Sequence, residues 1–195
     1  MEKSKCGREW KSLPMSAVLI AVAFVSGCIE SSRKTATAVV GDSTDVVSVA
    51  DTTAYGFIGE ATAMHTLQLI GDGGDTTEYF ISDEGSVVSE VKGGMLVGDR
   101  IAVIGTVAGG EMVAQKVLNL TSLLGRWMSI DKTFEIKEGG EVSSAPKPET
   151  GAWTSWRVSN GRLVLDRDTF EVLELGHDSL YLENSEGIFT YKRQQ

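Results

Sequence analysis

Residues that could carry out catalysis or bind a metal ion are few in this chain and poorly grouped. It contains two cysteines, Cys6 and Cys28, and two histidines, His65 and His177. His65 lies in a predicted strand and His177 in a predicted turn, and a common zinc site would need carboxylate ligands from other parts of the chain. The sequence has no nucleophile elbow, P-loop or dinucleotide fingerprint. We therefore expect no enzymatic activity, no metal ion and no cofactor.

Two pairs of aspartates are the remaining candidates for polar chemistry. Asp72 and Asp75 flank two glycines, but the alternating acids and distant glutamate of a calcium loop are missing. Asp166 and Asp168 could be paired catalytic carboxylates. In both cases a solvated turn is the favoured interpretation.

Three tryptophans, Trp127, Trp153 and Trp156, gather in the C-terminal part of the chain. Trp153 and Trp156 are three residues apart, which places them on opposite faces of a regular strand. Either both pack in a core with the help of a bulge, which we favour, or one is exposed and contacts a ligand or partner. The side chains predicted to line a ligand cavity are Trp153, Trp156, Val158, Leu163, Phe170 and Leu180.

The first 27 residues have the order of a secretory signal peptide. A basic stretch contains Lys3, Lys5, Arg8 and Lys11 and precedes an apolar run from Ser16 to Val25. That run is too short to span a bilayer, which takes about 20 apolar residues. The segment is therefore predicted to be a leader that is removed after export.

The residues at the end of this leader are Val25, Ser26, Gly27 and Cys28. They resemble the lipobox of bacterial lipoproteins, in which an aliphatic and two small residues precede a cysteine. The resemblance implies that Cys28 receives a diacylglyceryl group and becomes the new amino terminus. Two or more acyl chains make membrane anchoring stable. The protein is then expected in the bacterial cell envelope, attached to the outer membrane through Cys28.

Residues 28–54 are rich in Ser, Thr, Ala, Val and Asp and contain no aromatic residue. This composition predicts a flexible tether between the lipid and a folded body. Loss of the leader removes four of the 18 basic and two of the 27 acidic residues, which leaves a net charge of −11. Such a charge disfavours nucleic acid and anionic lipid headgroups as partners.

Residues 55–120 contain alternating, β-branched stretches separated by glycine turns, which predicts an antiparallel β-domain. The expected strands are one long strand over 56–70 that bends near Ala61, and strands over 76–82, 100–107 and 112–120. The stretch from Leu96 to Gly105 resembles a strand of the OB-fold, a small barrel that often binds single-stranded nucleic acid. The segment has three basic residues against nine acidic ones, so nucleic acid binding is not expected.

Residues 121–195 open with Gly125-Arg126-Trp127 and end near Arg193. A Gly-X-Trp on the first strand and an arginine on the last resemble the lipocalin (calycin) pattern, and lipocalin-like lipoproteins of Bacteroidota share this form. The resemblance implies that the arginine packs over the indole and closes one barrel end. Gly125, Trp127 and Arg193 would then be structural residues.

The rest of this segment predicts an up-and-down meander. Strands are expected over 127–136, 152–158, 162–166, 169–175, 179–183 and 187–192, with a strong hairpin signal at Asn160-Gly161. The segment is short for eight strands, so the barrel should be small, incomplete or completed by the first domain. The fold class expected overall is all-β, with two small antiparallel barrels, OB-like and then lipocalin-like.

Two functions of different class follow from these patterns. The first is a binding module that holds a small apolar or amphipathic ligand at the mouth of the lipocalin-like barrel. The second is a non-enzymatic interaction or structural module that presents a surface to another envelope protein. An apolar cavity would favour the first, and an exposed apolar patch or unprotected edge strand would favour the second. We expect the first, on the strength of the resemblance.

Overall fold

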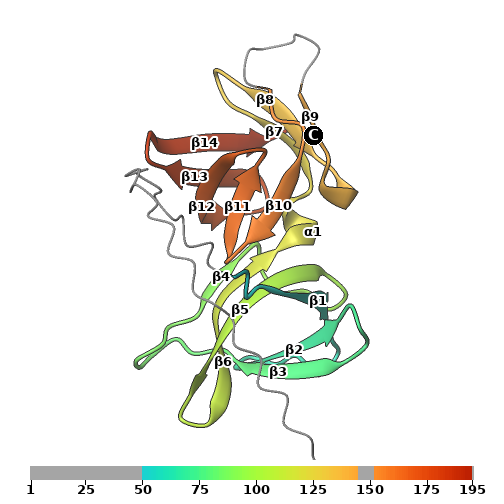
Figure 1. Ribbon diagram of the computed structural model, residues 1–195, viewed down its shortest axis with the longest axis vertical. Helices are drawn as coiled ribbons and strands as arrows, with labels where there is room; N and C mark the ends of the chain where they lie inside the picture. The colour runs from blue at the N-terminus through green and yellow to red at the C-terminus, as the bar shows by residue number, and fades with distance from the viewer. Residues whose placement is uncertain (1–49, 145–151, 195) are drawn as a thin grey trace, which may run out of the picture. The chain divides into compact units, whose positions relative to one another are not determined.

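The computed structural model describes residues 50–144 and 152–194, which fold into two β-barrels (Figure 1). Residues 47–195 cluster as one compact unit. The predicted leader, Cys28 and the tether up to residue 49 lie outside the described residues. The all-β fold class is confirmed: a closed five-stranded barrel is followed by a nearly closed eight-stranded antiparallel barrel.

The first barrel is closed by a parallel pairing between its third and last strands. Its strands are β1 (Ala54–Ile58), β2 (Thr66–Gly71), β3 (Thr76–Phe80), β4 (Glu90–Lys92), β5 (Arg100–Ala108) and β6 (Glu111–Asn119). The order is β3-β2-β1-β5-β6, and β3 meets β6 where Phe80 pairs with Val113. The short β4 lies parallel to β6 on its other edge. This order is compatible with an OB-like barrel.

One strand prediction for this barrel was wrong. The single bent strand expected over 56–70 is a hairpin, in which Phe57 of β1 pairs with Ile70 of β2. The chain reverses between Gly59 and Thr66, and the amide of Gly59 donates to the carbonyl of Gln68 at 2.9 Å. A Cβ at Gly59 would lie 2.0 Å from the Gln68 side chain, so the turn needs glycine at this position.

The second barrel is an up-and-down meander in which each strand neighbours the next along the chain. Its strands are β7 (Gly125–Met128), β8 (Thr133–Ile136), β9 (Val142–Ser144), β10 (Trp156–Ser159), β11 (Arg162–Leu165), β12 (Asp168–Leu175), β13 (Ser179–Asn184) and β14 (Gly187–Arg193). β14 returns to pair with β7. β9 and β10 meet only through an isolated bridge between Glu141 and Ser155, which leaves the barrel nearly closed.

Eight strands fit into this short segment because several are very short. β7, β8, β10 and β11 have four residues each, and β9 has three. The single strand expected over 127–136 is the β7–β8 hairpin, reversed by a hydrogen bond from the amide of Ser129 to the carbonyl of Lys132 at 2.8 Å. A 3-10 turn, η1 (Glu138–Gly140), then leads to β9. The strand order is compatible with a lipocalin-like barrel, and the first barrel supplies none of its strands.

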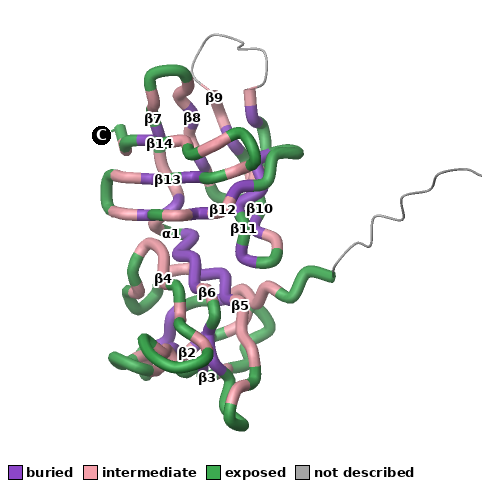
Figure 2. Tube along the Cα trace, turned by 90° about the vertical axis from the view of Figure 1, so that its left-hand side faces the viewer, coloured by how far each residue is buried: buried purple, intermediate pink, exposed green. Residues whose placement is uncertain are grey.

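A one-turn helix, α1 (Leu120–Leu123), links the two barrels and is capped by the side chain of Asn119. Leu120 and Leu123 are buried in the core of the second barrel, together with Ala102 of β5 and Leu118 of β6. Polar contacts accompany this shared core: the Tyr55 hydroxyl donates to the carbonyl of Val158 at 2.6 Å. The buried segments of both barrels are marked in Figure 2.

Candidate ligand-binding site

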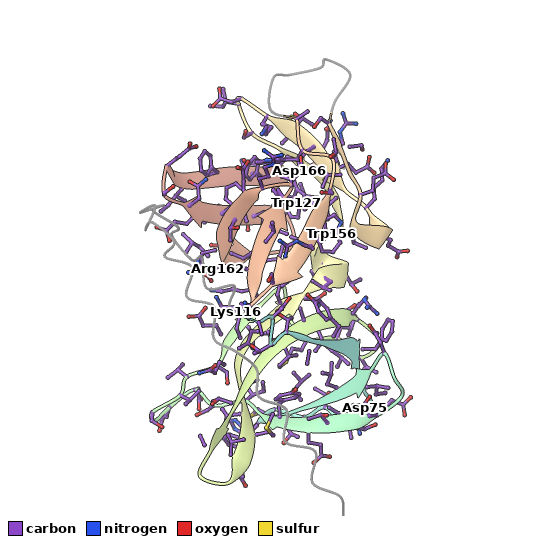
Figure 3. All side chains as sticks on the ribbon, viewed as in Figure 1. Asp75, Lys116, Trp127, Trp156, Arg162 and Asp166 are labelled. Atoms are coloured by element: carbon purple, nitrogen blue, oxygen red, sulfur yellow. The ribbon has the colours of Figure 1, made fainter. Side chains whose placement is uncertain are left out.

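One end of the second barrel is closed by Trp127 and Arg193. The guanidinium carbon of Arg193 lies 4.2 Å from the centre of the Trp127 ring, a distance at which a cation over an indole is stabilised. The indole N–H donates to the carbonyl of Leu123 at 2.9 Å. This is the contact that the lipocalin resemblance implies for these residues, and Figure 3 shows Trp127 inside the barrel.

Gly125 makes room for that arginine. Its φ is +123°, and a Cβ there would lie 2.5 Å from a guanidinium nitrogen of Arg193. Arg193 also donates to the carbonyls of Leu124 at 2.6 Å and His177 at 2.6 Å. Gly125, Trp127 and Arg193 thus hold the chain at this end and offer no room for a ligand.

The opposite end carries the turns β7–β8, β11–β12 and β13–β14 and has an aromatic interior. Phe134 meets Trp153 and Tyr191 edge-to-face, with ring centres 5.1 Å and 5.0 Å apart. Phe170 in turn meets Trp153 at 5.6 Å and Phe189 at 6.0 Å. Edge-to-face pairs at such distances are favourable, so these five rings form one continuous cluster.

Polar groups fix the ring nearest to solvent. The ammonium of Lys132 lies 3.4 Å from the centre of the Trp153 ring, and the indole N–H donates to the carboxylate of Asp168 at 2.8 Å. Burial, together with the negative charge of Asp131, raises the pKa of Tyr191 to about 12, so its hydroxyl stays protonated and able to donate a hydrogen bond. Apolar ring surface and polar groups therefore occur side by side.

These groups line an open concave region of about 1570 Å³, which we call the barrel mouth. Its floor includes Trp153, Phe170, Phe189 and Tyr191, and its rim is formed by residues 128–132, 167–169 and 183–188. Basic and acidic side chains both occur on the rim. The region is suited to a molecule with an apolar part and a polar or charged part.

The residues predicted to bind a ligand divide into two groups. Trp153 and Phe170 line the barrel mouth. Val158, Leu163 and Leu180 are buried in the barrel core and do not line the mouth. Trp156 also packs against the core and donates its indole N–H to the carbonyl of Lys137 at 2.7 Å.

Both indoles therefore pack inward, although Trp153 and Trp156 are three residues apart. The rule of opposite faces holds for regular strands. β10 begins only at Trp156, and the carbonyl of Ser155 is taken by the amide of Asp166 at 3.0 Å. The irregular backbone before β10 lets Trp153 turn back into the barrel.

Phe189, Tyr191 and Lys132 are mouth residues that the sequence did not single out. Phe189 and Tyr191 alternate with exposed neighbours along β14, and this alternation indicates that they point inward. Lys132 gives no such signal because it lies in a turn.

The other polar candidates form no catalytic arrangement in the described residues. His65 stacks on Phe80 with ring centres 6.3 Å apart. Asp72 makes a two-pronged ion pair with Arg100. The carboxylate of Asp166 accepts hydrogen bonds from the turn before β10. No group of three metal-ligating side chains is found within residues 50–144 and 152–194.

Comparison with protein-family models, curated proteins and solved structures found no match to this chain. Within the described ranges, no helix is long and apolar enough to cross a bilayer. The argument for function therefore rests on the geometry of the barrel mouth.

Proposed function

We propose that the second barrel binds a small apolar or amphipathic ligand at its mouth, on a protein that Cys28 anchors to the bacterial envelope. The observation that carries this proposal is the continuous aromatic cluster at the base of an open concavity. Apolar surface removed from water contributes about 25 cal/mol per Å². A ligand that covers the accessible edges of Phe189 and Trp153 would gain free energy in this way.

The polar groups around the cluster support an amphipathic ligand. Burial in a water-poor cleft strengthens hydrogen bonds and charge interactions. The Tyr191 hydroxyl and the Asp168 carboxylate lie beside the rings, so a ligand can place its polar end there while its apolar end meets the floor. The closed end, with Trp127 and Arg193, would keep the barrel rigid.

A second candidate is a protein-interaction module. It is favoured by the exposed pair Phe57 and Ile70 on the first barrel, which are 44% and 39% exposed and directly opposite each other on β1 and β2. Exposed neighbouring apolar side chains are typical of docking surfaces. A partner recovered with the native protein, and lost when both residues are changed to Ser, would support this candidate.

Titration with the apolar dye anilinonaphthalene sulfonate tests the ligand proposal. Phe189→Ala removes one half-buried ring from the floor, and we expect roughly tenfold weaker dye binding, because lost apolar contact of about 1.4 kcal/mol corresponds to that factor. Tyr181→Ala is the matched control, since Tyr181 is an aromatic residue on the outer face of β13. Equal loss in both variants, or no saturable uptake by the native protein, would contradict the proposal. Unfolding midpoints are measured alongside.

A further inference from the structure

The wall of the second barrel is incomplete beside the mouth, on the strand β14. This strand spans Gly187–Arg193 and pairs with β13 over its whole length from Gly187 to Lys192. Its pairing with β7 covers only Lys192 with Met128 and Arg193 with Trp127. The first half of β14 therefore has no strand partner on its β7 side among the described residues.

The backbone direction of that free edge can be derived. The amide of Gln194 donates to the carbonyl of Arg126 at 2.8 Å, so it points toward β7. The amide of Arg193 instead donates to the carbonyl of Asp178, on the β13 side. Because successive peptide groups of a strand alternate, the N–H and C=O groups of Thr190 and Ile188 point toward β7 and into the gap.

β7 cannot fill this gap because it ends at Met128. The chain then reverses, with the Ser129 amide bonded to the carbonyl of Lys132. Apolar side chains flank the opening: Met128 is 45%, Ile130 101% and Ile188 59% exposed. The gap also leads inward to Phe189 and Tyr191, since all five residues line the barrel mouth.

We propose that the occupant of the mouth is an extended peptide, which adds a strand to the free edge of β14 and inserts an apolar side chain among the rings. This inference rests on the proposed function and names its ligand class. Exposed strand edges bind peptides through main-chain hydrogen bonds, while alternate side chains enter pockets. A lipid or small aromatic molecule would cover the rings but would leave the N–H and C=O groups of Ile188 and Thr190 without a matched partner.

Charge narrows the peptide class further. Glu183 and Glu186, in and beside the β13–β14 turn, line the mouth next to the free edge. Neither carboxylate makes an ion pair with another described residue. A peptide with Lys or Arg at the end nearest this turn is therefore favoured, because opposite charges across a binding surface steer association and fix register.

The experiment uses the full chain and a pool of capped hexapeptides with Lys at both ends and apolar residues at the second and fourth positions. Binding is followed by fluorescence anisotropy. Two further pools carry N-methyl groups on the odd or on the even peptide nitrogens. An added strand uses only one of its edges, so we expect one N-methylated pool to bind roughly fivefold to tenfold more weakly than the other.

A variant of the protein makes the same test from the other side. Thr190→Pro removes the N–H that points into the gap, and its hydrogen bonds with β13 are kept because they come from the alternate residues. Thr190→Ala keeps the N–H and is the matched control. We expect weaker peptide binding in Thr190→Pro only, with unchanged dye binding in both variants. If Thr190→Pro fails to fold, the comparison of the two N-methylated pools decides.

The possible results separate this inference from the proposed function. Dye binding without peptide binding, or equal binding of both N-methylated pools, overturns strand addition and leaves the small-ligand proposal standing. Absence of both dye and peptide binding overturns the two together. Peptide binding with the expected dependence on one set of peptide nitrogens supports strand addition.

Discussion

Arg193, near the end of the chain, lies with its guanidinium carbon 4.2 Å from the centre of the Trp127 ring, in the first strand of the second barrel. Its nitrogens also donate to the carbonyls of Ser122 and Leu124, beside α1. One side chain therefore joins the first strand, the last strand and the helix that enters the barrel.

Replacement of this arginine should destabilise the protein. Arg193→Lys keeps the charge but loses the planar fork that reaches several carbonyls at once. From the cation–π contact and charged hydrogen bonds, discounted for partial exposure, we expect a loss of about 2 kcal/mol in the free energy of unfolding. Urea unfolding measures it, with the exposed neighbour Lys192→Ala as the control. Equal stability of Arg193→Lys and the native protein would contradict this role.

The closed barrel end illustrates what the sequence could predict. Gly125, Trp127 and Arg193 form a pattern that can be recognised without distances, and the glycine turns between strands are local signals. The meander was therefore anticipated. β4 and β9 were missed because three residues are too few to show an alternating pattern.

The barrel mouth could not be predicted in the same way. Lys132, Trp153 and Phe189 come together only when β14 closes on β7 and the irregular segment before β10 folds inward. Such long-range proximity leaves no spacing pattern in the chain. Val158, Leu163 and Leu180 were expected around a cavity because they are apolar and regularly placed, but core packing accounts for the same pattern.

Cooperative unfolding of the two barrels is a second prediction. Leu123 is fully buried in a core that also contains Ala102 and Leu118 of the first barrel. Leu123→Ala should cost about 2–5 kcal/mol and should lower the unfolding midpoints of both barrels together. Within the described residues all tryptophans lie in the second barrel, so indole fluorescence follows that barrel and amide exchange in β2 and β3 follows the first. Midpoints that separate would show that the shared core does not couple them.

A pH dependence is predicted at Asp166. Burial raises the pKa of this carboxyl, but hydrogen bonds from the side chains and backbone of Ser155 and Thr154 outweigh it and hold the pKa below its ordinary value of 3.8. Because the folded-state pKa is lowered, the stabilisation is present above the unfolded-state pKa and is lost as pH falls through the folded one. Asp166→Asn should therefore be less stable than the native protein at about pH 7 and should approach it below about pH 4. Thermal unfolding across this range tests it, and a difference that stays constant would refute the assignment.

Anchoring through Cys28 can be tested independently of the barrels. If the lipobox resemblance is correct, the mature chain starts at a lipidated cysteine and partitions with membranes. Cys28→Ser removes the thiol that would carry the lipid, and we expect the protein to move out of the membrane fraction or to retain its leader. Cys6→Ser, within the leader, is the control and should change neither property. Membrane association of Cys28→Ser with normal processing would rule out lipidation at this site.

Native mass spectrometry of the full-length gene product, purified from its own cells in mild detergent, tests the central claim most directly. The account predicts a bound species of defined mass at one copy per chain, retained in Tyr181→Ala and lost in Phe189→Ala. The mass of that species would also distinguish a peptide from another amphipathic molecule. A native protein that carries only its covalent modifications, or a bound species that survives in Phe189→Ala, would contradict binding at the barrel mouth.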